Sequence, residues 1–149
     1  MLHNRSVPAD TLLAHLTYRD VDVAVAWLTR VFGFQEHYRY GSNPTSGAQM
    51  YLGKAYIMVN RPKDRTSTPA QLGSATQSLT IFVENIEAHY ANAKSHGAQI
   101  VEELHETDYG EFQYAAIDLD GHHWLFSRHA KDIPPESWGA TPTTQPKSK

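Results

Sequence analysis

The stretch DLDGHHWLFSRH, residues 118–129, decides the fold of this chain. Its Asp120-Gly121 pair is typical of a tight hairpin turn, because glycine accepts a positive φ that other residues resist. The residues after the turn predict a strand, whose side chains alternate between two faces. One face carries His123, Leu125 and Ser127, and the other carries His122, Trp124 and Phe126. We expect Trp124, which is out of phase with Leu125, to pack against a helix.

The chain around this stretch runs twice through one order of elements: a strand, a helix and three strands. The first copy is expected at residues 11–19, 23–33, 36–41, 47–53 and 55–61, and the second at 77–85, 86–97, 99–106, 112–118 and 122–128. Gly33 and Gly97 are expected to end the helices, and Asp20 or Asp22 to cap the first. Each copy is too small to bury its own sheet face, so the two must pack together.

The remaining segments are polar or rich in proline. The expected division is an N-terminal arm at 1–10, a domain at 11–129 made of modules 11–60 and 77–129 with a linker at 61–76, and a C-terminal tail at 130–149. The arm is predicted to be loose and the tail to be extended or disordered. Trp138 is unusual in such a tail. It is expected to dock on its own domain, to contact a partner subunit or to be exposed to solvent.

Composition excludes several classes of function. The 149 residues carry a net charge of −3, and basic residues cluster only at the very end, which argues against nucleic acid and anionic membranes as partners. The absence of cysteine excludes disulfides, thiolate metal ligands and a cysteine nucleophile. The sequence shows neither the apolar core of a signal peptide nor an apolar run of membrane-spanning length. It therefore predicts a soluble, cytoplasmic protein.

The βαβββ repeat and the DxDGHxW turn resemble the glyoxalase/bleomycin-resistance/dioxygenase superfamily, the vicinal oxygen chelate proteins. The segments VENIEAHYANAKSHGAQIVEE (83–103) and YGEFQYAAIDLDGHHW (109–124) are most similar to its small, single-domain glyoxalase-like branch. The resemblance covers roughly residues 11–129. It implies an α+β fold in which two βαβββ modules form a cupped mixed sheet. Two positions depart from that branch, which usually has arginine at Phe112 and proline at Leu119.

Metal-dependent members of this superfamily hold a divalent ion with four strand residues, typically histidine and glutamate. The matching positions in this chain are Leu13, Met58, Ser78 and Leu125. These side chains are poor ligands, so neither a metal nor another cofactor is expected. His15 and His123 lie one strand step from Leu13 and Leu125, and a shifted metal site there would offer two ligands where at least three are expected. The superfamily's turn histidine, here His122, is expected to brace the hairpin.

The resemblance therefore implies a metal-free protein that binds a small organic molecule in a cupped pocket, with antibiotic-sequestering resistance proteins as the precedent. The expected ligand-binding residues are Leu13, His15, Met58, Ser78, Thr80, Tyr109, Gln113 and Leu125. The alternative is an enzyme of glyoxalase, lyase or isomerase type that uses His15 as a general base or a displaced metal site. Family precedent also implies a homodimer, in which two chains form two pockets.

Overall fold

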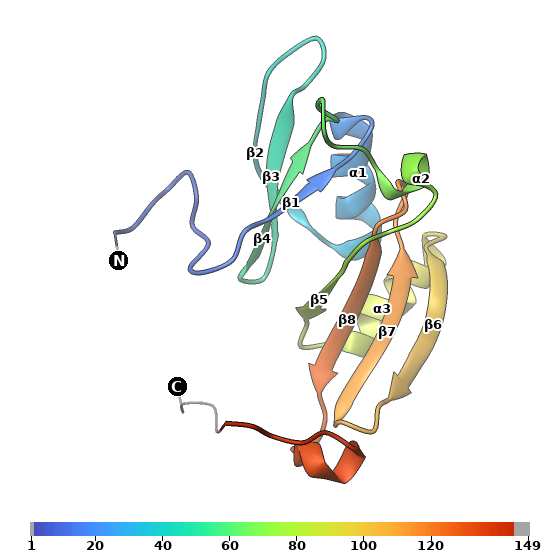
Figure 1. The fold of residues 1–149 in the computed structure, drawn as a ribbon. Coiled ribbons are helices and arrows are strands. Elements are labelled where there is room, and N and C mark those ends of the chain that lie inside the picture. The colour runs from blue at the N-terminus through green and yellow to red at the C-terminus, as the bar shows by residue number, and fades with distance from the viewer. Residues whose placement is uncertain (1, 145–149) are drawn as a thin grey trace.

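The computed structural model describes residues 2–144 and contains two four-stranded mixed sheets (Figure 1). The first sheet has the order β1-β4-β3-β2 and consists of β1 (Ala14–Thr17), β2 (Gln35–Tyr40), β3 (Gly47–Leu52) and β4 (Ala55–Asn60). The second has the order β5-β8-β7-β6 and consists of β5 (Ser78–Phe82), β6 (Gln99–Glu106), β7 (Glu111–Ile117) and β8 (His123–His129). In each sheet the first and last strands of the module run parallel. The predicted repeat and the α+β fold are confirmed.

One helix accompanies each sheet, and its ends follow from local chemistry. The Asp20 side chain accepts a hydrogen bond from the Val23 N–H and caps α1 (Val21–Phe32). Gly33, with a φ of 78°, ends this helix in the left-handed conformation that glycine favours. The second helix, α3 (Ile86–Ser95), is capped by Asn85. Both helices begin and end where the sequence predicts them, to within two residues.

The two modules share one hydrophobic core, which α1, α3 and one face of each sheet enclose. Phe32 at the end of α1 lies at the junction of the modules, with ring centroids 5.8 Å from Trp124 and 4.8 Å from Phe126. Trp124 is fully buried. Its predicted packing against a helix is confirmed, and neither module has a core of its own.

The Asp118 carboxylate fixes the hairpin turn at residues 118–122 to the first module. It accepts hydrogen bonds from the Tyr18 hydroxyl (2.6 Å), the Trp124 indole N–H (2.9 Å) and the backbone N–H groups of Asp120 and His122 (both 3.0 Å). Asp118 is buried, and these four donors replace the water that it loses. Burial and the neighbouring Asp118 carboxylate raise the pKa of Tyr18, which keeps its hydroxyl protonated as a donor.

Two more contacts join the turn to the end of β1. The Asp120 carboxylate accepts hydrogen bonds from the backbone N–H and the Nε of Arg19, at 2.8 and 2.9 Å. The Nε2 of His122 donates to the Thr17 carbonyl at 2.7 Å, which confirms its bracing role. Gly121 has a φ of 92°, and a Cβ there would lie 2.8 Å from the Ala70 nitrogen. Only glycine fits both its backbone conformation and this close approach.

The arm and the linker are more ordered than the sequence suggests. The Ser6 carbonyl accepts hydrogen bonds from the Tyr38 hydroxyl and the Gln49 side chain, at 2.9 and 3.1 Å, so the arm is attached to the first sheet. The linker contains a short helix, α2 (Pro69–Leu72), which Thr68 caps. Neither segment is a free loop.

The expected extended or disordered tail is wrong for residues 135–138, which form a 3₁₀ helix, η1 (Pro135–Trp138). The Trp138 ring meets the Tyr109 ring edge to face at 5.7 Å, so Trp138 docks on its own domain while 43% of its surface remains exposed. The physical reason lies upstream, where the Ala130 and Lys131 N–H groups donate to the Gly110 carbonyl and turn the tail back. The last five residues, 145–149, lie outside the described part of the chain.

Candidate functional site

Each sheet has one face in the core and a second face, called here the open face, which in the first sheet the N-terminal arm covers at Gln49. In the first sheet the open face carries His15, Met58 and Gln49, which are cross-strand partners, while their neighbours Leu16 and Val59 point into the core. In the second sheet Leu125 is the cross-strand partner of both Thr80 and Ala115, and Ser78 of His123. Gln113 shares this face, and Tyr114 is fully buried on the other side.

The eight predicted ligand-binding residues do not surround one cavity in the single chain. His15 and Met58 belong to the first sheet, Leu13 directly precedes β1, and Ser78, Thr80, Gln113 and Leu125 belong to the second sheet. Tyr109 lies in the β6–β7 loop, where it contacts Trp138. The joint role of these residues stays a prediction.

The four positions that carry the metal in metal-dependent relatives do not fit a divalent ion. Leu13 and Leu125 have no donor atom, and Met58 and Ser78 offer a thioether and a hydroxyl, whereas such ions prefer imidazole and carboxylate. His15 and His123 lie on different sheets. Within residues 2–144, no group of three or more histidine, aspartate or glutamate side chains is placed to hold a metal ion. Within the described residues, the chemistry of these four side chains therefore does not suit a divalent ion.

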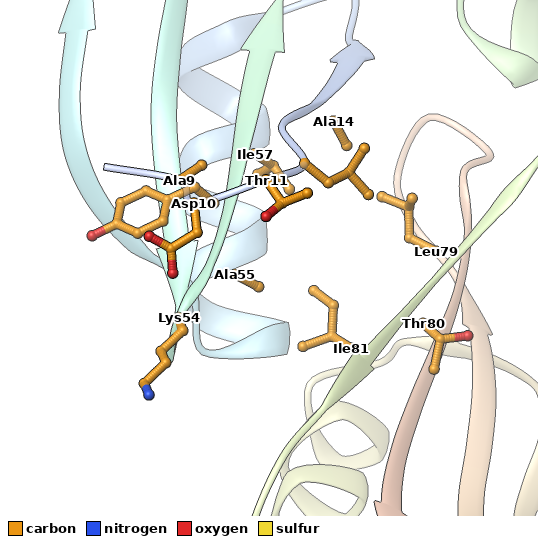
Figure 2. A pocket seen from close by; sticks show the side chains of 12 residues that line it. Ala9, Asp10, Thr11, Ala14, Lys54, Ala55, Ile57, Leu79, Thr80 and Ile81 are labelled. Carbon is orange, nitrogen blue, oxygen red and sulfur yellow. The ribbon is translucent and has the colours of Figure 1, made fainter. Parts of the chain in front are cut away.

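A cavity of about 290 Å³ lies between the two sheets, where the unpaired edges of β1 and β5 face each other (Figure 2). Its walls are mainly apolar and come from Ala14, Ala55, Ile57, Leu79 and Ile81. Its polar contributors are Thr11, Thr80, Asp10 and Lys54. Apolar walls with a few polar groups are typical of a small-molecule site.

Sequence reasoning did not identify this cavity, and of the eight predicted ligand-binding residues only Thr80 is among its lining residues. Alternation along β5 places Thr80 on the same face as Leu125, opposite to Leu79 and Ile81. Leu79 and Ile81 lie on the core side of β5, and Ile81 is buried. Their second role could not be seen from periodicity, because a strand edge lines a cavity only when no neighbouring strand covers it.

His89 is a half-buried titratable group that links α3 to both modules. Its Nε2 donates to the Phe32 carbonyl at 2.7 Å, and its Nδ1 accepts from the Tyr114 hydroxyl at 2.6 Å. Its ring also lies 4.2 Å from the Phe126 ring, measured between centroids. Burial lowers the pKa of His89, and the hydrogen bond to Phe32 opposes this in part.

We expect the free energy of unfolding to fall as the pH drops below about 6.5, the ordinary pKa of histidine in an unfolded chain. Below that pH the unfolded chain binds a proton that the folded chain still excludes, so the loss continues until the pH reaches the lowered pKa of His89. Urea unfolding between pH 7.5 and 5 measures this slope. His89→Gln should flatten it, whereas the same change at the exposed His96 should leave it as it is.

The comparisons with known proteins agree with this architecture. Residues 11–126 match the family model of the Glyoxalase/Bleomycin resistance protein/Dioxygenase superfamily. Among solved structures, TioX from Micromonospora sp. ML1 is 33% identical, with a TM-score of 0.69, and the match covers 80% of this chain and 98% of that chain. No curated protein matches the sequence. Among the described residues, no helix has the length and apolar character that crossing a bilayer requires.

More distant structures share the fold alone. A superfamily member from Sphaerobacter thermophilus is 12% identical with a TM-score of 0.66, over 78% of this chain and 94% of that chain. An enzyme of this family from Burkholderia phytofirmans is 20% identical with a TM-score of 0.58, over 78% of this chain and 96% of that chain. Because the family model spans most of the sequence, the chain belongs to the Glyoxalase/Bleomycin resistance protein/Dioxygenase superfamily.

Proposed function

We propose that this protein binds a small, mainly apolar organic molecule without a metal ion, and that it does so as a homodimer. The observation that carries the proposal is the cavity between the two sheets (Figure 2). Its volume of about 290 Å³ is at the lower end of the range for ligand pockets, so the ligand, or the part that enters, is small. Sequestration of an antibiotic is the narrower form of the proposal, and resistance proteins of the superfamily are its precedent.

The lining of the cavity supports an apolar ligand with one or two polar groups. Ile57 from β4 and Ile81 from β5 provide branched apolar surface from both modules. Transfer of apolar ligand surface from water contributes about 25 cal/mol per Å² buried. The hydroxyl of Thr11 can orient a carbonyl or hydroxyl of the ligand, for about 0.5–1.5 kcal/mol.

Filling the cavity is expected to abolish binding without loss of the fold. Ala55 is half-buried at the cavity wall, so Ala55→Phe places a ring in space that is open in the native chain. A thermal-shift screen of apolar aromatic compounds identifies a ligand first, since a ligand at 100 times its Kd adds about 2.7 kcal/mol of stability. Calorimetry should then show at least a tenfold loss of affinity in Ala55→Phe.

The matched control is Ala26→Phe, which adds the same ring at an exposed position of α1. This variant should bind the ligand as the native chain does. Equal affinity in both variants would place the ligand outside this cavity, and the open faces would then become the site to test.

The homodimer has its own structural support. β1 and β5 each pair with a neighbour on one side only, and exposed strand edges in stable proteins are normally covered or protected. Leu12 and Phe82, beside these edges, are 78% and 55% exposed.

Light scattering at tens of micromolar is therefore expected to give twice the 16.8 kDa mass of one chain. Phe82→Asp should shift the mass toward that of one chain, because a carboxylate in an apolar interface loses its water without gaining a partner. Val101→Asp, also exposed but on β6, is the control and should leave the dimer intact. A native chain that scatters as a monomer contradicts this part of the proposal.

A further inference from the structure

A second cavity, of about 340 Å³, lies beneath the linker that joins the modules. The cavity is lined by His15 and Thr17 of β1, by several linker residues between Arg65 and Gln77, and by His122 of the hairpin turn. It is separate from the apolar cavity, since the two have no lining residue in common. The chemistry of its walls is also different.

The described lining of this cavity contains basic side chains and no carboxylate. Among the described residues that form the cavity, one arginine and two histidines occur, but neither aspartate nor glutamate. The whole chain has more acidic than basic residues, 16 against 13, so the exclusion of carboxylates is a local feature. Arg65 is exposed, and its guanidinium forms no ion pair within residues 2–144. Its fork of N–H donors therefore remains available to a ligand.

His122 supplies a fixed nitrogen at the same wall. Only 7% of its surface is exposed, and its Nε2 is held by the Thr17 carbonyl. Its Nδ1 has no hydrogen-bond partner in the described part of the chain. No buried side-chain nitrogen or oxygen there lacks a partner, so this Nδ1 must be open to solvent, and His122 lines this cavity. The hydroxyls of Ser67 and Ser74 line it as well.

We propose that this cavity binds a small oxyanion, either a phosphate or the carboxylate of an organic acid. The planar guanidinium of Arg65 can bind two oxygens of such a group at once. Hydroxyls from the linker donate to the remaining oxygens, and the Nδ1 of His122 can accept a hydrogen bond from the P–OH group of a phosphate. Because the linker supplies most of these donors, an oxyanion would also fix the linker between the two modules.

Calorimetric titration of the full chain with inorganic phosphate tests the proposal, with sulfate, acetate and citrate as parallel arms. Saturable phosphate binding is expected. Binding of phosphate and sulfate alone would indicate a phosphate site, whereas tighter binding of acetate or citrate would indicate a carboxylate site. Arg65→Gln should weaken binding at least tenfold. Lys63→Gln removes the same charge from the same linker at a side chain outside the lining, and it should change the affinity less than twofold.

Two results would overturn the inference. One is no saturable binding of any of the four anions at millimolar concentration. The other is an equal loss in Arg65→Gln and Lys63→Gln, which would indicate a diffuse effect of charge. Ser67→Ala gives a second, mild variant that should weaken binding a few-fold. Ala55→Phe should leave phosphate binding unchanged, so this inference and the apolar-ligand proposal can fail independently.

Discussion

Replacing Asp118 with alanine is expected to lower the free energy of unfolding by about 3–4 kcal/mol. The Asp118 carboxylate is the acceptor for the Tyr18 hydroxyl, the Trp124 indole and two backbone N–H groups. A buried donor left without a partner costs about 1–3 kcal/mol, and part of that cost is relieved when water enters. The loss is large because one substitution affects four donors and separates the turn from the first module.

Urea unfolding followed by circular dichroism measures this change. Asp118→Asn keeps one acceptor oxygen and should lose less stability than Asp118→Ala. Asp108→Ala removes an exposed carboxylate nearby in the sequence and should change stability by less than about 0.5 kcal/mol. If the free energy of unfolding of Asp118→Ala lies within about 1 kcal/mol of that of the native chain, the four hydrogen bonds do not hold the turn in place.

The fold could be predicted from sequence because its signals are local. The Asp120-Gly121 turn, the helix-ending Gly33 and Gly97 and the alternation along residues 122–128 each act over a few residues. The contact between Tyr18 and Asp118 could not be predicted, because the two are 100 residues apart in the chain. Composition and periodicity say nothing about such a pair.

The candidate site was harder to predict, because it too depends on residues that are far apart in the chain. Alternation places Leu125 on the face of β8 that points away from the core, whereas Leu13 lies just before β1, and the distance between the two sheets depends on how α1 and α3 pack. The apolar cavity exists because the edges of β1 and β5 stay unpaired, and its walls have the same kind of residue as a core. The cavity beneath the linker depends on Arg65 and His122 meeting across the fold.

Phe32→Ala is expected to lower the free energy of unfolding by about 3–5 kcal/mol, which corresponds to a fall in Tm of roughly 8–16 °C. Phe32 is fully buried, and its ring contacts Trp27 of its own helix as well as Trp124 and Phe126 of the second module. Truncation leaves a cavity where the modules meet. The aromatic rings around it belong to different elements and cannot all move inward.

The comparison with Phe82→Ala shows how far the two modules depend on each other. Phe82 is 55% exposed, so in the single chain its truncation removes little buried surface and should cost less than about 1 kcal/mol. Because the core is shared, Phe32→Ala should lower the midpoint of one cooperative transition, with fluorescence and circular dichroism reporting the same curve. Two separate transitions would instead show that each βαβββ module folds by itself, and the cavities between them would then open before the sheets unfold.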